Sequence, residues 1–231
     1  MMGIERKKLS MTERDRLNTA IHEAGHAAVC YFTPGAKKLY KATVVARGGS
    51  LGATYMEPDD SDMISTNKMK MLAQIDTAMG GHVAEKLFIG GNKVTTGCSG
   101  DLQGATSIAY QAVMRFGMFG DDVGYVSSRM EDLSEEAKAK VDKKVTTLLQ
   151  ESEERVERLL MKKDKELRVL AKNLYWYDYL DAKEMDVIFK GGKLANKEKV
   201  REYKFTTDIE EEKLPTEGID AALPAEEKNI L

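Results

Sequence analysis

The five residues His22–His26 constrain this chain more than any other segment, because they read His-Glu-Ala-Gly-His. On a helix, histidines four residues apart point to the same side and can hold one metal ion between them. The glutamate after the first histidine then lies beside the open coordination position, where it can take a proton from the attacking water. The motif therefore predicts His22 and His26 as metal ligands and Glu23 as the general base, provided that a helix carries it.

The residues around the motif predict that helix. Thr12–Asp15 has the pattern of a capping box, which pairs backbone N–H groups at a helix start. Apolar residues then recur at spacings of three and four, as on one face of a helix; they are Leu17, Ile21, Ala24, Ala28 and Phe32. Pro34–Gly35 ends the pattern. We predict a helix over residues 13–32, and this context favours a metal site over a chance match to a short motif.

Composition limits the class of protein to which the chain can belong. With 231 residues, of which 42% are apolar, it suits one domain with a real core and some appendages. The net charge of −3 gives no electrostatic reason to bind nucleic acid. No apolar run approaches the roughly 18 residues of a membrane span, and the start lacks the pattern of a signal peptide. The two cysteines, Cys30 and Cys98, do not make a disulfide framework, and we expect Cys30 to be buried as a small apolar residue.

The rest of the chain reads as mainly helical with one short hairpin. Residues 39–47 and 51–56 read as short strands, and Gly48–Gly49 predicts the turn between them. Further helices are expected at residues 65–88, 101–116, 134–163 and 165–176, with a short last helix that a capping-box pattern opens within Leu180–Glu184. Residues 92–100 and 118–133 are expected to be irregular.

A pair of glycines lies inside one of the predicted helices. Gly80–Gly81 interrupts the helical pattern of residues 65–88, and close packing against a neighbouring element would explain a glycine pair there.

The composition changes at Gly191: residues 208–231 carry eight acidic and two basic side chains and two prolines, so we predict a disordered tail. No G-x-x-x-x-G-K-[ST] pattern occurs, so the chain contains no P-loop.

A catalytic zinc ion usually has three protein ligands, and the motif supplies only two. Asp101 lies where a loop of small residues enters a helix, and Glu85 lies on the predicted helix that carries the glycine pair. Chemistry alone ranks these two carboxylates level, followed by His82 and then Cys98. Each also has a structural explanation: Asp101 as an ordinary helix-start carboxylate, Glu85 as a salt-bridge partner or a support for the ligands, and His82 as a surface residue.

Several further segments, in a fixed order, are more specific than the motif alone. They are Thr19–Ala27, Leu39–Gly48, Leu51–Thr54, Gly80–Glu85, Thr96–Gln103, Gly117–Met118 and Asp121–Gly124, preceded by Met2–Lys7. Together they resemble the protease domain of the FtsH-type AAA metalloproteases over residues 2–190, with Met2–Lys7 similar to the linker that leaves the ATPase domain. Within this family, the resemblance is strongest to the mitochondrial i-AAA branch. Three segments carry it: Tyr40–Thr43, Gly97–Gln103 and Ser152–Arg155.

The resemblance implies a helical, zincin-like fold with a small sheet, and it resolves the choice of ligand. In this family the aspartate matched by Asp101 completes the zinc site, so Glu85 becomes a supporting residue. His82 departs from the family pattern, which generally has Arg or Lys there. We expect residues 1–12 to be a linker from a missing ATPase domain, residues 13–190 to be the peptidase domain and residues 191–231 to be the tail.

The implied function is a zinc endopeptidase that degrades unfolded or membrane-extracted polypeptides, with ATP acting only through the missing ATPase domain. The full-length protein is expected to be a homo-hexamer at the mitochondrial inner membrane, facing the intermembrane space, and held there by a segment outside this chain. A substrate strand is expected to add to one edge, at Gly49, Leu51, Gly52, Ala53 and Thr54. The alternatives are a catalytically silent hexamerisation module, for which a broken motif would be expected, and a zinc hydrolase of small amides.

Overall fold

The computed structural model describes residues 11–46, 50–58, 66–124, 130–194 and 197–200, and the structural statements below concern these residues. The elements are α1 (Glu13–Phe32), β1 (Leu39–Thr43), β2 (Ala53–Met56), α3 (Lys68–Phe88), α4 (Ser99–Tyr110), α5 (Gly120–Val123), α6 (Glu135–Lys162), α7 (Asp164–Tyr177), β3 (Tyr179–Asp181) and α8 (Ala182–Phe189). Short helical turns lie at Gly91–Lys93, Thr96–Cys98, Gln111–Arg115 and Met130–Asp132. The prediction of a mainly helical fold with a small sheet is confirmed.

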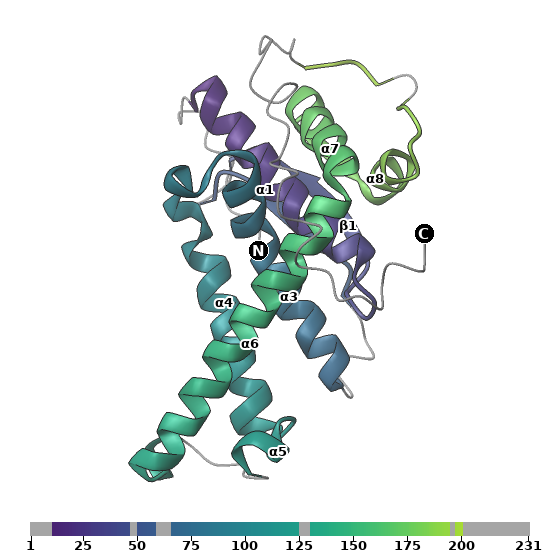
Figure 1. Ribbon diagram of the computed structural model, residues 1–231. Helices are drawn as coiled ribbons and strands as arrows, with labels where there is room; N and C mark the ends of the chain where they lie inside the picture. Colours follow the sequence, from purple (N-terminus) through teal and green to yellow (C-terminus); the bar gives the residue numbers. More distant parts are fainter. Residues whose placement is uncertain (1–10, 47–49, 59–65, 125–129, 195–196, 201–231) are drawn as a thin grey trace, which may run out of the picture.

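The helices divide into a broad part and a long leg (Figure 1). The broad part contains α1, the sheet, α7 and α8, and α3 runs through it. In the leg, the N-terminal half of α6 runs beside the end of α4 and the short α5 (Figure 1). Among the described residues, no helix has both the length and the apolar character that crossing a bilayer requires.

The motif helix α1 has the predicted limits and lies at the centre of the broad part. Its capping box is complete, because Thr12 accepts from the Asp15 N–H and the Asp15 carboxylate accepts from the Thr12 N–H. From Leu17 to Cys30 most of its side chains are buried, since α3, α7 and the sheet pack around it. A helix in this position can hold side chains still at its middle, where the motif lies.

Helix α1 crosses α3 with the two backbones in contact. A Cβ atom placed on Gly25 would lie 2.4 Å from the carbonyl oxygen of Gly80, and one placed on Gly80 would lie 2.8 Å from that of Gly25. The predicted reason for the glycine pair, close packing, is confirmed. The predicted interruption is wrong, because α3 continues through Gly80–Gly81 and its packing offsets the low helix propensity of glycine. The helix also begins later than predicted, after Asn67 caps it.

The sheet has three antiparallel strands in the order β2-β1-β3, so β2 forms one edge. The predicted pair of strands is present but shorter, because β1 ends at Thr43 and β2 begins at Ala53. The predicted turn at Gly48–Gly49 lies outside the described residues. Strand β3 was not predicted, since three residues directly after a helix carry no alternating pattern of their own.

A left-handed residue makes the reversal from α7 into β3 possible. Asp178 caps the C-terminus of α7 with φ of 61°, and Asp and Asn adopt this conformation more readily than bulkier residues. Its carbonyl oxygen accepts from the Val44 N–H at 2.9 Å and from the Thr43 hydroxyl at 3.0 Å. These two hydrogen bonds join the end of α7 to the edge of β1 that faces away from β2.

The remaining helices agree with the sequence to within two residues, apart from the region of α4. That helix begins at Ser99, two residues before the predicted start, and continues as a π-helical turn over Gln111–Arg115. The stretch at 118–133, predicted to be irregular, contains the short α5 and a 3-10 turn at Met130–Asp132. The capping box that opens α8 is present at Asp181.

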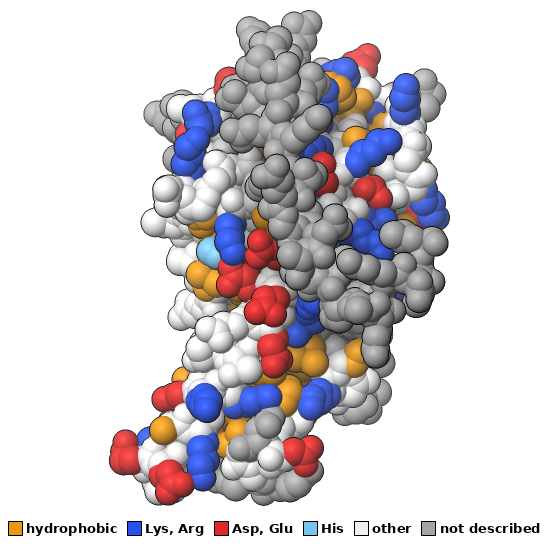
Figure 2. All heavy atoms as spheres, viewed as in Figure 1, with side chains coloured by type: hydrophobic (Ala, Val, Ile, Leu, Met, Phe, Trp, Pro, Cys, Tyr) orange, Lys and Arg blue, Asp and Glu red, His pale blue; other side chains and the backbone are white. Residues whose placement is uncertain are grey.

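Hydrogen bonds and an ion pair around the buried Asp76 carboxylate link α3 to α6. The Asp76 carboxylate accepts from the Ser152 hydroxyl at 2.6 Å and from the Arg155 guanidinium at 2.7 and 3.1 Å. On the face shown in Figure 2, acidic and basic side chains are interspersed, with a group of acidic side chains over the middle of α6. Two acidic residues of α6, Glu153 and Glu157, pair with Lys86 of α3.

Candidate metal centre

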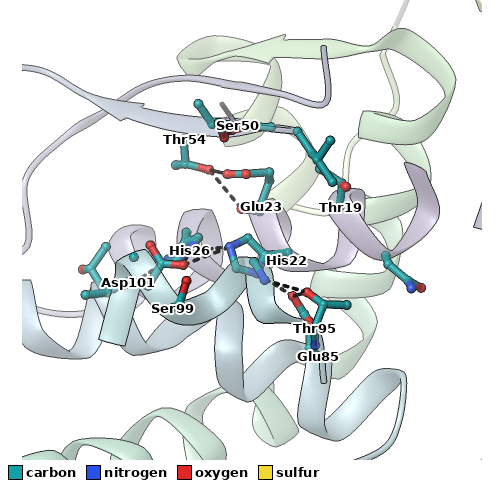
Figure 3. A pocket seen from close by; sticks show the side chains of 18 of the residues that line it. Thr19, His22, Glu23, His26, Ser50, Thr54, Glu85, Thr95, Ser99 and Asp101 are labelled. Atoms are coloured by element: carbon teal, nitrogen blue, oxygen red, sulfur yellow. Dashed lines mark hydrogen bonds and ion pairs between the residues drawn. The ribbon is translucent and has the colours of Figure 1, made fainter. Parts of the chain in front are cut away.

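Three donor atoms meet where α1, α3 and α4 come together. His22 Nε2 lies 3.1 Å from His26 Nε2 and 3.1 Å from Asp101 Oδ2, and His26 Nε2 lies 3.4 Å from the same carboxylate oxygen. Figure 3 shows the two histidines side by side, with Asp101 reaching them from a neighbouring helix. The early start of α4 places Asp101 in its first turn, where the helix dipole favours a carboxylate.

The spacing and chemistry of these donors fit a zinc ion. Ligands bound at about 2.0–2.2 Å around a tetrahedral ion lie roughly 3.3–3.5 Å from one another. The observed separations of 3.1 to 3.4 Å are close to that range. Two imidazoles and one carboxylate also leave a fourth position for water or substrate, as catalytic zinc sites do.

Both histidines are oriented through their second ring nitrogen. His22 Nδ1 lies 2.8 Å from Glu85 Oε1, and His26 Nδ1 lies 2.7 Å from the backbone carbonyl oxygen of Thr77. Partners of this kind hold the ring and the tautomer in which Nε2 is free to bind a metal. Glu85 is held in turn by the Thr95 N–H at 2.7 Å. The geometry thus gives Glu85 a supporting position behind His22.

The charges around the histidines favour a cation. Burial alone would lower the pKa of His22, but its hydrogen bonds with Asp101, Cys98 and Glu85 outweigh burial and raise the pKa to about 12. Burial alone would raise the pKa of Asp101, but its contacts with the two histidines hold that pKa well below the usual range. Asp101 therefore stays ionised, and the negative charge around the His22 ring favours a cation.

The other two candidate ligands lie differently. Cys98 is buried near His22, and its Sγ lies 3.3 Å from Glu85 Oε1 and 3.8 Å from His22 Nδ1. This group gathers at the back of His22, on the nitrogen that faces away from His26, and burial raises the pKa of the Cys98 thiol. His82 belongs to neither group of candidate metal ligands found among the described residues, and its buried Nδ1 has no hydrogen-bond partner there.

Glu23 lies against the sheet, next to the histidines. It is 5% exposed, and burial raises the pKa of its carboxyl, which favours a group able to take up a proton. Its Oε2 accepts from the Thr54 hydroxyl at 2.7 Å. Figure 3 shows the Glu23 carboxylate between the histidine pair and the strand that carries Thr54. Glu23 therefore has the place and the environment of a general base.

Two features of the centre were not recognised from the sequence. A backbone carbonyl, such as that of Thr77 at His26, is present at every position and cannot be recognised by residue type. Gly81 was singled out for packing, but it also borders the metal position: a Cβ atom there would lie 2.5 Å from both His22 Cε1 and His26 Nε2. The glycine pair therefore serves two contacts, Gly80 with α1 and Gly81 with the ligands.

A cavity of about 1020 Å³ contains the centre and extends along β2. Its lining includes the histidines, Glu23, Asp101 and the predicted substrate-contacting residues Leu51, Gly52, Ala53 and Thr54. Gly49, the fifth of those residues, lies outside the described part of the chain. A partly open cavity of this volume beside an edge strand has room for an extended chain.

Known proteins with similar sequences agree with this chemistry. Residues 9–188 match the family described as "Peptidase family M41". The chain is 44% identical over 196 residues to the "Mitochondrial inner membrane i-AAA protease supercomplex subunit YME1" of Saccharomyces cerevisiae, covering 84% of this chain and 26% of that protein. It is 38% identical to "ATP-dependent zinc metalloprotease YME1L1" of Mus musculus, covering 84% and 27%.

A bacterial protein is similar over the same part. The chain is 35% identical over 207 residues to "ATP-dependent zinc metalloprotease FtsH" of Myxococcus xanthus, covering 84% of this chain and 32% of the relative. The chain thus spans between a quarter and a third of the length of these three curated relatives.

Proposed function

Because the chain belongs to peptidase family M41, we propose that it is a zinc-dependent endopeptidase domain of the FtsH type. His22, His26 and Asp101 are its proposed metal ligands, and Glu23 is its proposed general base. One observation carries the proposal: three donor atoms from α1 and α4 lie within 3.4 Å of one another, and a buried carboxylate lies next to them on α1. A silent module would have no need to keep this arrangement.

The roles of the residues follow from their positions. The two histidines and Asp101 would hold a zinc ion, which when bound would supply Lewis-acid chemistry at the scissile carbonyl. Glu23 accepts a proton from the attacking water and delivers it to the leaving amine. Glu85 and the Thr77 carbonyl keep the histidine rings turned toward the metal.

The proposed substrate is an unfolded or membrane-extracted polypeptide. Among the described strands β2 pairs only with β1, so its other edge can accept an extended chain. Leu51, Gly52, Ala53 and Thr54 are the proposed contacts, together with Gly49. A stably folded protein keeps most of its backbone within its own structure, which would limit this domain to chains or segments that are already unfolded.

The wider setting is proposed from the relatives. Two of the relatives are named as ATP-dependent zinc metalloproteases, and the third is named as a subunit of an i-AAA protease supercomplex of the mitochondrial inner membrane. With that similarity as support, we propose that the full-length protein is a homo-hexamer at the mitochondrial inner membrane, facing the intermembrane space, where an ATPase domain would feed substrate to the proposed zinc site. ATP acts only through that domain, and no nucleic acid is involved.

Metal analysis combined with cleavage of unfolded casein tests the proposal. The purified chain should contain about one zinc ion per chain and cut casein, and a chelator should abolish both. Glu23→Gln should keep the zinc and lose at least about 99% of the cleavage, because a general base contributes on the order of 10²–10⁴ in rate. Glu151→Gln, at an exposed position on α6, is the control. Near-normal turnover by Glu23→Gln would overturn the assignment of the base.

A further inference from the structure

The Glu23 carboxylate is held by a strand and not by its own helix. The Thr54 hydroxyl of β2 lies 2.7 Å from Glu23 Oε2 and 3.2 Å from the Glu23 backbone oxygen. A hydroxyl has one hydrogen to donate, and the shorter contact to the charged oxygen is the stronger. Since Glu23 is 5% exposed, water competes little for this bond.

The second carboxylate oxygen faces a glycine. A Cβ atom on Gly52 would lie 2.7 Å from Glu23 Oε1, 2.7 Å from Thr19 Cγ2 and 2.9 Å from the backbone oxygen of Thr43. All three distances are below 3.0 Å, so a side chain at position 52 would force atoms around it to shift, with Oε1 among the two nearest. Among the described residues, none donates a hydrogen bond to Oε1.

The two contacts make the carboxylate oxygens unequal. Oε2 is occupied by the Thr54 hydroxyl, whereas Oε1 keeps its lone pairs for another donor. Both contacts come from one short segment, Gly52–Thr54, whose backbone is fixed by antiparallel pairing of Ala53 with Thr43 and of Thr54 with Ala42. The position of Glu23 is thereby tied to the register of the sheet.

We propose that Gly52 and Thr54 position the general base: Thr54 anchors Oε2 of Glu23, and Gly52 leaves Oε1 as the oxygen that takes the proton from the attacking water. The inference rests on the proposed function of Glu23. It changes the role expected for these two residues, since the side chain of Thr54 serves Glu23 while only the backbone edge is left for a substrate. Thr54 is a positioning residue and touches no reacting atom.

Kinetics of two Thr54 variants test this role. Thr54→Val keeps the shape but loses the hydroxyl, and Thr54→Ser keeps the hydroxyl. Thr54→Val should lower kcat for an unstructured peptide about 10- to 100-fold, because a hydrogen bond to a charged group is lost. Its KM should change less than about twofold if the backbone edge is intact. Thr54→Ser should recover most of kcat.

Two further variants separate positioning from general damage. Thr43→Val removes a hydroxyl from the neighbouring strand that bonds to the Asp178 carbonyl and not to Glu23. It should leave kcat within about threefold of wild type. Gly52→Ala should lower kcat as strongly as Thr54→Val, since its methyl group displaces Oε1. Zinc content and Tm are measured for each variant, and crystal structures report whether Glu23 keeps its rotamer.

Several outcomes would contradict the proposed positioning role of Thr54 and Gly52. Wild-type kcat in Thr54→Val, an unchanged Glu23 rotamer in that variant, or equal loss in Thr54→Ser and Thr54→Val would overturn the inference. So would a defect that lies in KM alone. A wild-type chain that binds zinc and cuts no peptide would overturn the proposed function as well, and it is recognised before any variant is compared.

Discussion

At the scale of single residues, the centre is built from a few side chains whose neighbours decide their roles. Asp101 and Glu85 are both carboxylates beside His22, yet one faces Nε2 and the other faces Nδ1. The nitrogen that each carboxylate faces is the reason for proposing Asp101 as a ligand and Glu85 as a support for His22. Chemistry of residue types alone cannot make this distinction.

The two carboxylates are therefore expected to respond differently to neutralisation. Asp101→Asn removes a charged donor from the metal position, so zinc affinity should fall by more than about 100-fold. Glu85→Gln removes only the hydrogen-bonded support of His22, so the loss should stay within about 10- to 100-fold. Zinc titration against a competing chelator measures both. If Glu85→Gln loses more affinity than Asp101→Asn, the wrong carboxylate has been chosen as ligand.

Gly81 provides a second prediction at this scale. Its added methyl group in Gly81→Ala would lie 2.5 Å from atoms of both histidines, so the rings must move and bound zinc should fall below about 10% of wild type. Gly104→Ala is the matched control, because a Cβ atom there meets nothing within 4 Å. Metal content after dialysis decides the matter, with circular dichroism to check the fold. Full zinc occupancy in Gly81→Ala would contradict the expected crowding.

At the scale of elements, α3 links the metal centre to the rest of the molecule. It touches α1 through Gly80, supports His26 through the Thr77 carbonyl, and is fastened to α6 through Asp76. Asp76 and Thr77 are neighbours in the chain, so the contacts of Asp76 with α6 and the histidine support share one turn of helix. The position of this turn depends on α6, which is far away in sequence.

Removing the charge that joins α3 to α6 should destabilise the fold. Asp76→Ala leaves the Ser152 hydroxyl and the Arg155 guanidinium without their buried acceptor, and we expect a loss of about 2–3 kcal/mol in the free energy of unfolding. This value is below that of a fully buried pair, because the Arg155 side chain is 34% exposed. Urea unfolding measures it. Glu135→Ala, which breaks an exposed pair with Lys138, is the control; an equal effect of both variants would refute the argument.

At the scale of the whole molecule, α1, α3 and α4 meet at the candidate metal centre. The chain contains no P-loop, and its cavity lies beside an edge strand. The proposed peptide hydrolysis requires an extended peptide at the candidate metal centre and no nucleotide.

Because the proposed hydrolysis requires no nucleotide, we predict how the 231-residue chain cleaves the unfolded and the folded form of one substrate. A permanently unfolded variant of a small protein should be cut at the same rate with and without ATP. The folded form should be cut at least about 100-fold more slowly under both conditions, because only its rare unfolded molecules offer an extended segment. Gel assays of all four combinations provide the measurement. ATP-stimulated digestion of the folded form by this chain alone would contradict the proposal.

Much of the local structure could be predicted because its causes are local. The capping box and the apolar spacing around His22–His26 lie within one helix, so they predicted the limits of α1. The long helices followed from the same periodicity. Strand β3 was missed because Tyr179–Asp181 is a strand only through its pairing with β1. The early start of α4 was missed because small residues such as Ser99 and Gly100 have weak preferences of their own.

The sequence by itself determined that a helix carries two histidines and a glutamate in the spacing of a metal site, since residues one turn apart meet on any helix. The tertiary structure decided what surrounds them. Glu85 reaches His22 across 63 positions of sequence, and Thr54 reaches Glu23 across 31. Such contacts arise only when separate elements pack together, and no local spacing encodes them. The histidine pair is therefore local, whereas the third proposed ligand, Asp101, and the orientation of the histidines and of Glu23 depend on the packing of α1 against α3, α4 and β2.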